Sequence, residues 1–313
     1  MSMKFRRFLC FLTALLLISG CAGKEDGKKY PSEYEPSPSP KMSELRLPSS
    51  PGEQVAVDSS GLVQIDYSNT SSGYLQAKLL HKPEKRMRLQ ITKDGVGNIA
   101  YDFTKENEYE TFPFEQGSGT YLVKVLENRS GKTYTITLTL SVDVKLENER
   151  IPFLYPNQTV NYDSHTAAVK KAFDLTKDDD TVLKRIATLY NYVVDNISYD
   201  SKKAKEVEDI YVLPVVDETL ESKKGICFDY AALLAAMLRS QQIPTRLVTG
   251  NTTIEYHAWV EVYIEGKGWI NPDILLHAKK WSRMDPTFDA SDIDYKDDYE
   301  DKITLRRKTD ERI

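Results

Sequence analysis

The sequence predicts an α+β domain that follows a smaller all-β domain. Two observations support this fold class. Short alternating or β-rich runs, separated by turn signals, fill residues 53–147, and this spacing is typical of a small antiparallel sandwich. After Pro152 the apolar residues follow a helical period, and strand-like runs return only from Thr245 onward. Helices that precede an antiparallel sheet indicate an α+β domain.

The all-β domain is predicted over residues 53–150. Its strand-like runs are residues 62–67, 87–91, 121–125 and 134–140. The turn signals between them are Asp94-Gly95, Gly117-Ser118-Gly119 and Ser130-Gly131-Lys132, which contain the residue types that turns favour. No motif here carries recognisable chemistry, so we predict a spacer or partner-binding module.

The second domain, residues 151–290, begins with helical patterns. Residues Val182, Ile186, Leu189 and Val193 share one helix face. The acidic residues 178–180 precede that helix, where its dipole favours negative charge. They lack the spaced loop and central glycine of a calcium site, and no metal or other cofactor is expected. A second helix follows Gly225, and strands are predicted over 245–248 and 257–264.

The N-terminus has the pattern of an export signal. Basic residues precede an apolar run over residues 8–18, and small residues lead to Cys21. This arrangement resembles the lipobox of bacterial lipoproteins. The resemblance implies cleavage after residue 20 and acylation of Cys21, which would anchor the protein to the extracytoplasmic face of the cell membrane. A transmembrane anchor is the alternative, but the run is shorter than the roughly 20 residues that a span requires.

Amino-acid composition indicates the structure of the two remaining segments and the class of partner that the protein can bind. Residues 21–52 are rich in Lys, Glu, Ser and Pro and are predicted to form an extended tether; residues 291–313 are predicted to be a charged tail. The sequence has 42 basic and 47 acidic residues, and three of the basic residues lie in the predicted signal peptide. The mature chain would therefore have 39 basic residues and a net charge of −8. This balance argues against nucleic acid as a partner.

Cys227 is the candidate nucleophile. The other cysteines, Cys10 and Cys21, fall in the signal and at the acylation position, so Cys227 has no disulfide partner. It lies where a loop meets a helix, and the N–H groups of that helix end favour a thiolate and could stabilise an oxyanion. We expect Gly225 to leave room for a substrate. A carboxylate at Asp229 would oppose the thiolate, and its expected role is to bind first-turn amides.

His257 is the candidate base. Among the histidines of the mature chain, it alone begins a predicted strand after the cysteine helix; the others are His81, His165 and His277. Strand alternation places His257 on one face with Trp259, Glu261 and Tyr263. Taken in isolation, a surface histidine would be the simpler interpretation, so the prediction depends on the combination with Cys227.

The combined motifs resemble the transglutaminase-like superfamily of papain-like thiol enzymes. They are Gly-Ile-Cys-Phe-Asp-Tyr-Ala at 225–231, Arg239 with Ile243-Pro244, His-Ala-Trp-Val-Glu-Val at 257–262 and Trp-Ser-Arg-Met-Asp-Pro-Thr-Phe at 281–288. The resemblance implies that Cys227 is the nucleophile and His257 the base and acid. It also implies an aspartate that orients the imidazole, following triad logic.

Two aspartates compete for the third position. A three-residue hairpin loop at 264–266 would make Asp273 face His257, whereas a four-residue loop at 265–268 would turn Asp273 to the opposite face. In the superfamily this aspartate commonly follows a tryptophan by four residues and precedes Pro-Thr. Asp273 and Asp285 both meet the first condition, and Asp285 alone meets the second. Because Pro286 also makes Asp285 extended, we place Asp285 first.

The predicted function is that of a membrane-anchored thiol enzyme that forms an acyl-thioenzyme on peptide or protein amides. Water as acceptor would make it a peptidase or amidase, and an amine would make it a transglutaminase. The triad does not distinguish them. The alternative is a catalytically idle module for peptide binding or adhesion. A solute-binding lipoprotein would need two α/β lobes, which the pattern does not show.

Overall fold

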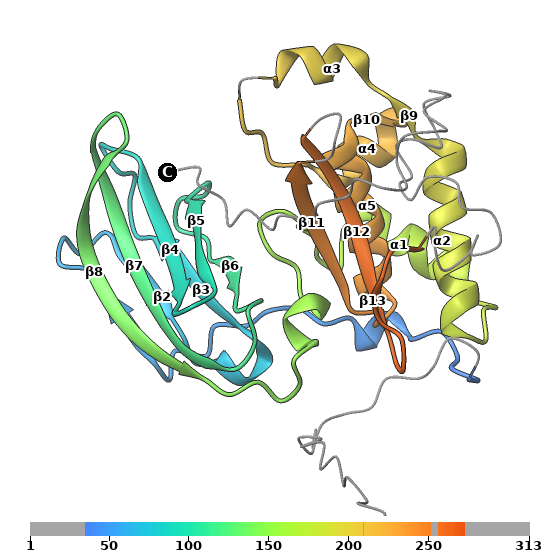
Figure 1. The fold of residues 1–313 in the computed structure, drawn as a ribbon, viewed down its shortest axis with the longest axis horizontal. Helices are drawn as coiled ribbons and strands as arrows, with labels where there is room; N and C mark the ends of the chain where they lie inside the picture. Colours follow the sequence, from blue (N-terminus) through green and yellow to red (C-terminus); the bar gives the residue numbers. More distant parts are fainter. Residues whose placement is uncertain (1–34, 209, 252–255, 273–313) are drawn as a thin grey trace, which may run out of the picture.

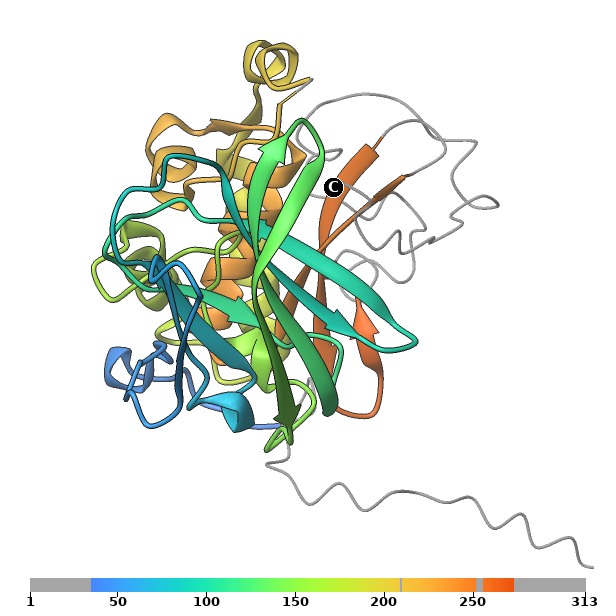
Figure 2. The same ribbon diagram turned by 90° about the vertical axis from the view of Figure 1, so that its left-hand side faces the viewer.

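The computed structural model describes residues 35–208, 210–251 and 256–272. Two units lie side by side, an all-β unit and an α+β unit (Figure 1). Viewed from the side of the all-β unit, the long strands β7 and β8 cross in front of the helices (Figure 2). The predicted fold class is therefore confirmed.

The all-β unit is a sandwich of two antiparallel sheets, with the orders β1-β2-β3-β6 and β5-β4-β7-β8. The strands of the first sheet are β1 (Val55–Val57), β2 (Val63–Asp66), β3 (Tyr74–Leu79) and β6 (Glu110–Pro113). Those of the second are β5 (Gly97–Asp102), β4 (Met87–Lys93), β7 (Gly119–Ser130) and β8 (Thr133–Val144). The inner faces bury one apolar cluster, which includes Ile65, Leu89, Phe112 and Val123. The four predicted strands correspond to β2, β4, β7 and β8.

The α+β unit places helices ahead of a three-stranded sheet. The helices are α1 (Ala167–Thr176), α2 (Val182–Asn196), α3 (Ser201–Glu206), α4 (Val216–Ser222) and α5 (Cys227–Ser240). The sheet has the order β11-β12-β13, formed by Thr245–Asn251, Tyr256–Ile264 and Gly268–Ile270. Helix α2 begins as predicted, and the N-cap side chain of Thr181 accepts from the Lys184 amide. None of the described helices is both long and apolar enough to cross a bilayer.

The hairpin between β12 and β13 differs from both predicted loops. It has three residues, Glu265 to Lys267, and Ile264 pairs with Gly268. Gly266 has the predicted positive φ, 80°, and it is the third residue of a turn closed by the hydrogen bond from the Lys267 amide to the Ile264 carbonyl. The predicted register is nevertheless wrong, because a loop at 264–266 would pair Tyr263 with Lys267, whereas Tyr263 pairs with Trp269.

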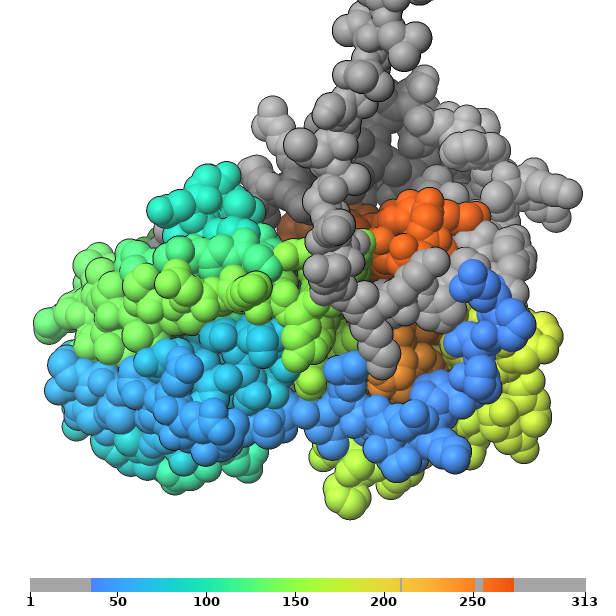
Figure 3. Space-filling model, turned by 90° about the horizontal axis from the view of Figure 1, so that it is seen from below, coloured from blue at the N-terminus to red at the C-terminus, as the bar shows by residue number. Residues whose placement is uncertain are grey.

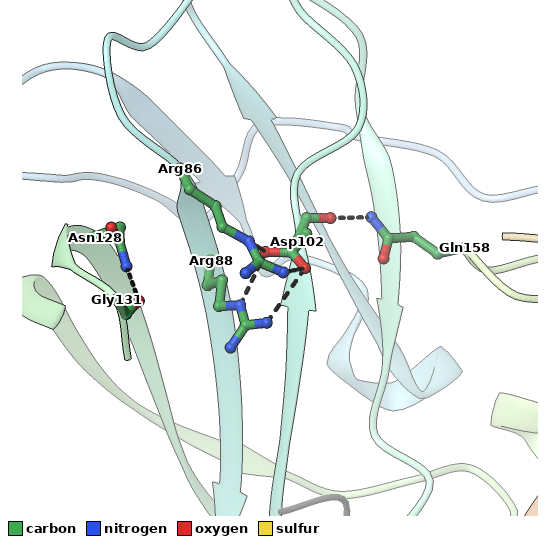
Figure 4. Close-up of polar contacts among 6 residues, drawn as sticks. All are labelled: Arg86, Arg88, Asp102, Asn128, Gly131 and Gln158. Carbon is green, nitrogen blue, oxygen red and sulfur yellow. Dashed lines mark hydrogen bonds and ion pairs between the residues drawn. The ribbon is translucent and has the colours of Figure 1, made fainter. Parts of the chain in front are cut away.

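The segment that joins the two units, residues 145–166, is bound to the sandwich, and we call it the linker. The Gln158 amide donates to the Asp102 carbonyl and to the Glu110 carboxylate, each at 2.7 Å. Arg86 and Arg88 both bind the Asp102 carboxylate (Figure 4). Burial acts to raise the pKa of Asp102, but the hydrogen bonds from the two guanidinium groups outweigh it and lower that pKa. An ionised Asp102 therefore holds β4 and β5 together where the linker attaches.

The described part of the predicted tether is not a free linker. Residues 35–46, which we call the strap, lie against the α+β unit, and the chain continues across to the sandwich (Figure 3). The Ser37 amide donates to the Asp180 carbonyl at 2.7 Å, and buried Arg185 donates to Ser37. Met42 and Leu45 pack against the apolar core of the α+β unit. The composition of this segment did not predict these contacts, because the apolar packing involves two side chains, Met42 and Leu45, within an otherwise polar and proline-rich sequence.

The strap is expected to contribute to stability. Replacing Met42 and Leu45 together by alanine should lower the free energy of unfolding by about 1–3 kcal/mol, because two partly buried apolar side chains lose their contacts. Urea unfolding of the full chain measures this difference. Leu47→Ala is the matched control, since Leu47 is exposed, and should change stability by less than about 0.5 kcal/mol. Equal effects of the two changes would show that the strap does not bind.

Candidate active site

Cys227 is the first residue of α5, and the chain before it is held by a short parallel pairing. Strand β10 (Lys224–Gly225) pairs with β9 (Ser198–Tyr199), so that Gly225 lies beside Tyr199. The Asp200 amide donates to the Gly225 carbonyl at 2.8 Å. Cys227 itself is partly exposed. The candidate nucleophile therefore follows a fixed backbone and is partly open to solvent.

Asp229 closes the first turn of α5. Its Oδ2 accepts from the Ile226 amide at 2.9 Å, which is the reciprocal half of a capping box. Isoleucine has no side-chain acceptor, so the other half cannot form. Asp229 is only 2% exposed, and both of its carboxylate oxygens lie 2.8 Å from Nζ of Lys203. The expected role of Asp229, binding an amide of the helix start, is thus confirmed.

The role predicted for Gly225 needs correction. Gly225 is buried, and a Cβ atom there would lie 2.7 Å from the Cβ of Asp229 and 3.3 Å from Cγ2 of Thr219. A real Cβ does not approach carbon so closely. The absence of a side chain at Gly225 therefore lets the Asp229 turn close against the preceding strand. It does not serve to leave space for a substrate.

Helix α5 is buried on almost every side. Residues 229–240 are all buried, and the helix packs against α1, α2, α4, β11 and β12. Near its start, the Tyr230 hydroxyl donates to the Ile197 carbonyl at 2.6 Å. Near its end, buried Arg239 donates to the carbonyls of Thr245 and Tyr155 at 2.8 and 2.7 Å. These contacts fix the position of Cys227 through the helix that carries it.

His257 is the second residue of β12, where it pairs with Gly250 of β11. Its side chain is 2% exposed, and its Nδ1 atom is shielded from solvent. The alternate residues Ala258, Val260, Val262 and Ile264 belong to the apolar core shared with α5. The predicted alternation of β12 is therefore confirmed, and His257 is a buried residue and not a surface histidine.

The packing of α5 on β12 brings the starts of both elements to one end of the unit. The Tyr263 amide donates to the Pro244 carbonyl at 2.9 Å, so the last residues of β12 lie beside the chain that leaves α5. Cys227 lies about 20 Å back along the helix from Ser240. His257 lies about 20 Å back along the strand from Tyr263. The two elements run side by side (Figure 1), so Cys227 and His257 lie towards the same end of the unit.

The opposite face of the sheet is tied to the linker. Arg246 binds Glu261 at 2.5 Å and stacks 4.3 Å from the ring of Trp269. From the linker, Arg150 lies 4.2 Å from the Tyr263 ring, and Phe153 contacts Trp269 edge-on with ring centroids 4.7 Å apart. These interactions hold β12 and β13 from the side that α5 does not cover.

The remaining predicted residues divide into two groups. Asp273, Asp285, His277 and Cys21 lie outside the described residues. His81 and His165 are exposed, one beyond β3 in the sandwich and the other just before α1. No group of three His, Cys, Asp or Glu side chains within the described residues has a geometry suited to a metal ion. Lys203 was not predicted, because it lies 26 residues from Asp229 in sequence and belongs to no motif.

The family comparison concerns the α+β unit. Residues 169–274 match the sequence model of the transglutaminase-like superfamily. This range includes most of α1, all of α2 to α5, all three strands of the sheet, Cys227 and His257. The α+β unit is therefore a transglutaminase-like domain.

Two curated proteins are similar in sequence. An uncharacterized protein of Bacillus subtilis, YebA, is 28% identical over 226 residues, which are 59% of this chain and 30% of YebA. UPF0252 protein MJ1282 of Methanocaldococcus jannaschii is 35% identical over 102 residues, which are 28% of each chain. The chain thus matches less than a third of the length of these relatives.

Three solved structures are similar at TM-scores below 0.5. A candidate cysteine protease from Cytophaga hutchinsonii is 19% identical, with a TM-score of 0.35 and coverage of 63% of this chain and 77% of its own. A candidate protease from Parabacteroides distasonis is 11% identical, with a TM-score of 0.29 and coverage of 68% and 64%. Red sea bream transglutaminase is 14% identical, with a TM-score of 0.24 and coverage of 63% and 47%.

Proposed function

We propose that this protein is a thiol enzyme that forms an acyl-thioenzyme on the amide groups of peptides or proteins. The observation that carries the proposal is the placement of Cys227 and His257 at the same end of packed elements, with Cys227 at a helix start. A nucleophile, a base within reach and a set of amide donors are the parts that acyl transfer needs.

The reaction follows from these parts. His257 takes the proton of the Cys227 thiol, and the sulfur attacks the carbonyl carbon of an amide. When the C–N bond breaks, the imidazolium gives its proton to the departing amine, and a thioester remains on Cys227. Water or a second amine then attacks the thioester while His257 takes its proton. The acid or new amide leaves, and the thiol is restored.

The oxyanion of each tetrahedral intermediate needs hydrogen-bond donors. The first-turn N–H groups of α5 have no acceptor within the helix, and the Cys227 amide is the first of them. Such donors stabilise charge that develops in the transition state. Tyr199 is the second candidate donor, because β9 holds it in register with Gly225, two residues before the nucleophile.

The third residue of the triad is either Asp273 or Asp285. The matched family range ends at residue 274 and therefore contains Asp273 but not Asp285. Asp273 also follows the end of β13 by three residues. We now favour Asp273, although the Pro-Thr sequence after Asp285 supports the other assignment. The general role of either carboxylate would be to orient the imidazole.

An exposed apolar segment beside α5 supports a peptide substrate. Four side chains between residues 210 and 215 are 43–60% exposed, namely Ile210, Tyr211, Val212 and Val215. The ring of Tyr211 lies 5.8 Å from that of Phe228, the residue after Cys227. A substrate side chain of apolar character could pack there. We further propose that acylation of Cys21 anchors the domain at the outer face of the membrane, near envelope peptides and proteins.

The thiol of Cys227 is expected to be activated by His257. Iodoacetamide should label the Cys227 peptide at pH 6–7, below the range above about pH 8 in which a free cysteine reacts readily. His257→Ala should slow this labelling at least about tenfold, because the proton acceptor is lost. Mass spectrometry of the Cys227 peptide gives the rate, with His165→Ala as the control. Labelling only above pH 8 and indifference to His257→Ala would favour the idle binding module.

The acceptor can be determined with one substrate. A peptide amide with a leucine or phenylalanine beside the reacting group should yield free acid when water is the acceptor. Added primary amine should yield the amine conjugate at the expense of the acid if the enzyme is a transferase. Chromatography of the two products measures the partition, and Cys227→Ser should abolish both. Products that persist in Cys227→Ser would contradict the acyl-thioenzyme.

The two aspartates can be separated by substitution. Asp273→Ala should lower kcat by at least about 100-fold, because an imidazole without its orienting carboxylate loses the correct tautomer and position. Asp285→Ala should leave kcat within about threefold of the parent if Asp273 holds the third position. The opposite result would restore Asp285. Near-parent rates in both variants would show that neither carboxylate belongs to the triad.

A further inference from the structure

The Lys203–Asp229 contact connects a separate helix to the nucleophile turn. Lys203 lies in α3, and its Nζ atom is 2.8 Å from both oxygens of Asp229. Asp229 is 2% exposed, whereas the Lys203 side chain is 31% exposed. A buried carboxylate is stabilised by a cation within hydrogen-bond distance. Lys203 supplies that cation from outside α5.

Asp229 is also close to Cys227. In helix geometry the Cα atoms of residues two apart are separated by about 5.5 Å. An uncompensated carboxylate at this distance would disfavour a thiolate on Cys227. A unit charge within about 10 Å, at an effective dielectric constant of about 20, changes a titration midpoint by about one pH unit. The backbone of this turn therefore needs the Asp229 carboxylate as a hydrogen-bond acceptor, although the negative charge of that carboxylate disfavours a thiolate on Cys227.

Other charged groups near this turn do not replace Lys203. Asp200 caps the amides of α3 and is partly exposed, and Lys224 of β10 is exposed. Helix α4 contributes the neutral side chain of Thr219 next to Gly225. From the sheet, His257 is the proposed base. Lys203 is the cation that directly contacts the Asp229 carboxylate.

We propose that Lys203 is a positioning residue whose ammonium group neutralises Asp229, so that Asp229 can hold the Cys227 turn without opposing the thiolate. The inference rests on the proposed function, because it assigns Lys203 a part in preparing the nucleophile. It gives α3 a role in the reaction through the contact of Lys203 with Asp229. A purely structural salt bridge would affect stability but not the reactivity of the thiol.

Labelling of Cys227 by iodoacetamide across pH tests the proposal in the full chain. Lys203→Met should move the midpoint of the labelling profile upward by about one pH unit, and thus slow labelling at pH 7 about tenfold. Lys203→Arg should retain the parent profile, since it keeps the cation. Asp229→Asn keeps an oxygen acceptor for the Ile226 amide. In that background, Lys203→Met should no longer move the midpoint.

Lys202→Met is the matched control. Lys202 lies on the same helix, is 87% exposed and pairs with Glu206, so its loss removes the same charge without affecting Asp229. Thermal unfolding shows whether each variant is folded. If Lys203→Met does not fold, Asp229→Asn alone must move the midpoint downward, because it leaves the ammonium uncompensated.

Failure of this proposal and failure of the proposed function give different labelling results. A folded Lys203→Met with the parent profile would overturn the proposal, as would an equal shift in Lys202→Met or a shift that persists in the Asp229→Asn background. His257→Ala reports on the proposed function alone. If His257→Ala leaves labelling unchanged, that function fails, while the Lys203 and Asp229 variants still decide whether the ion pair controls the thiol.

Discussion

The burial of α5 against β12 is the constraint on which the candidate site depends. Leu233, Leu234 and Leu238 are fully buried, and each contributes about 1.5–3 kcal/mol through the removal of apolar surface from water. The hydrogen bonds of Tyr230 and Arg239 fix the two ends of the helix. Because the helix cannot slide against the strand, the residues that begin each element are held in one relative position.

Helix geometry gives a reason for a candidate nucleophile to lie at the end of an element. A helix start offers amide donors and a favourable dipole only within its first turn, so the thiol gains nothing from a position further along α5. The backbone amides of this turn also need hydrogen-bond acceptors. Asp229 accepts from the Ile226 amide, but its negative charge is then buried. Separating Asp229 from Lys203 would leave that charge uncompensated, which typically destabilises a protein by about 3–5 kcal/mol.

Much of the fold could be predicted because periodicity reflects burial. Strand β12 shows the expected alternation, and α2 begins at the predicted acidic segment. Helix α1 was missed, since its buried face consists of small residues such as Ala168 and Ala172, which give a weak apolar pattern. The hairpin register was wrong because Gly266 and Gly268 both accept positive φ, so composition alone did not determine where the turn begins.

Part of the candidate site could be proposed from the sequence for a similar reason. Cys227 and His257 lie in local motifs, and each motif could be recognised without knowledge of tertiary contacts. Lys203 and the strap act through partners far away in sequence, and neither has a pattern of its own. The roles of Gly225 and Arg239 also depend on packing: Gly225 admits Asp229, and Arg239 satisfies carbonyls beyond the helix end. Side-chain type did not reveal these contacts.

We infer that α5 and β12 bring the Cys227 sulfur and the His257 imidazole together. Treatment of the full chain with 1,3-dibromoacetone tests it directly, because the reagent bridges a thiol and an imidazole through only three carbon atoms. After proteolysis, mass spectrometry should find the Cys227 and His257 peptides joined, and none joined in His257→Ala. Alkylation of Cys227 without a bridge, or a bridge to a different residue, would show that the Cys227 sulfur and the His257 imidazole are not together.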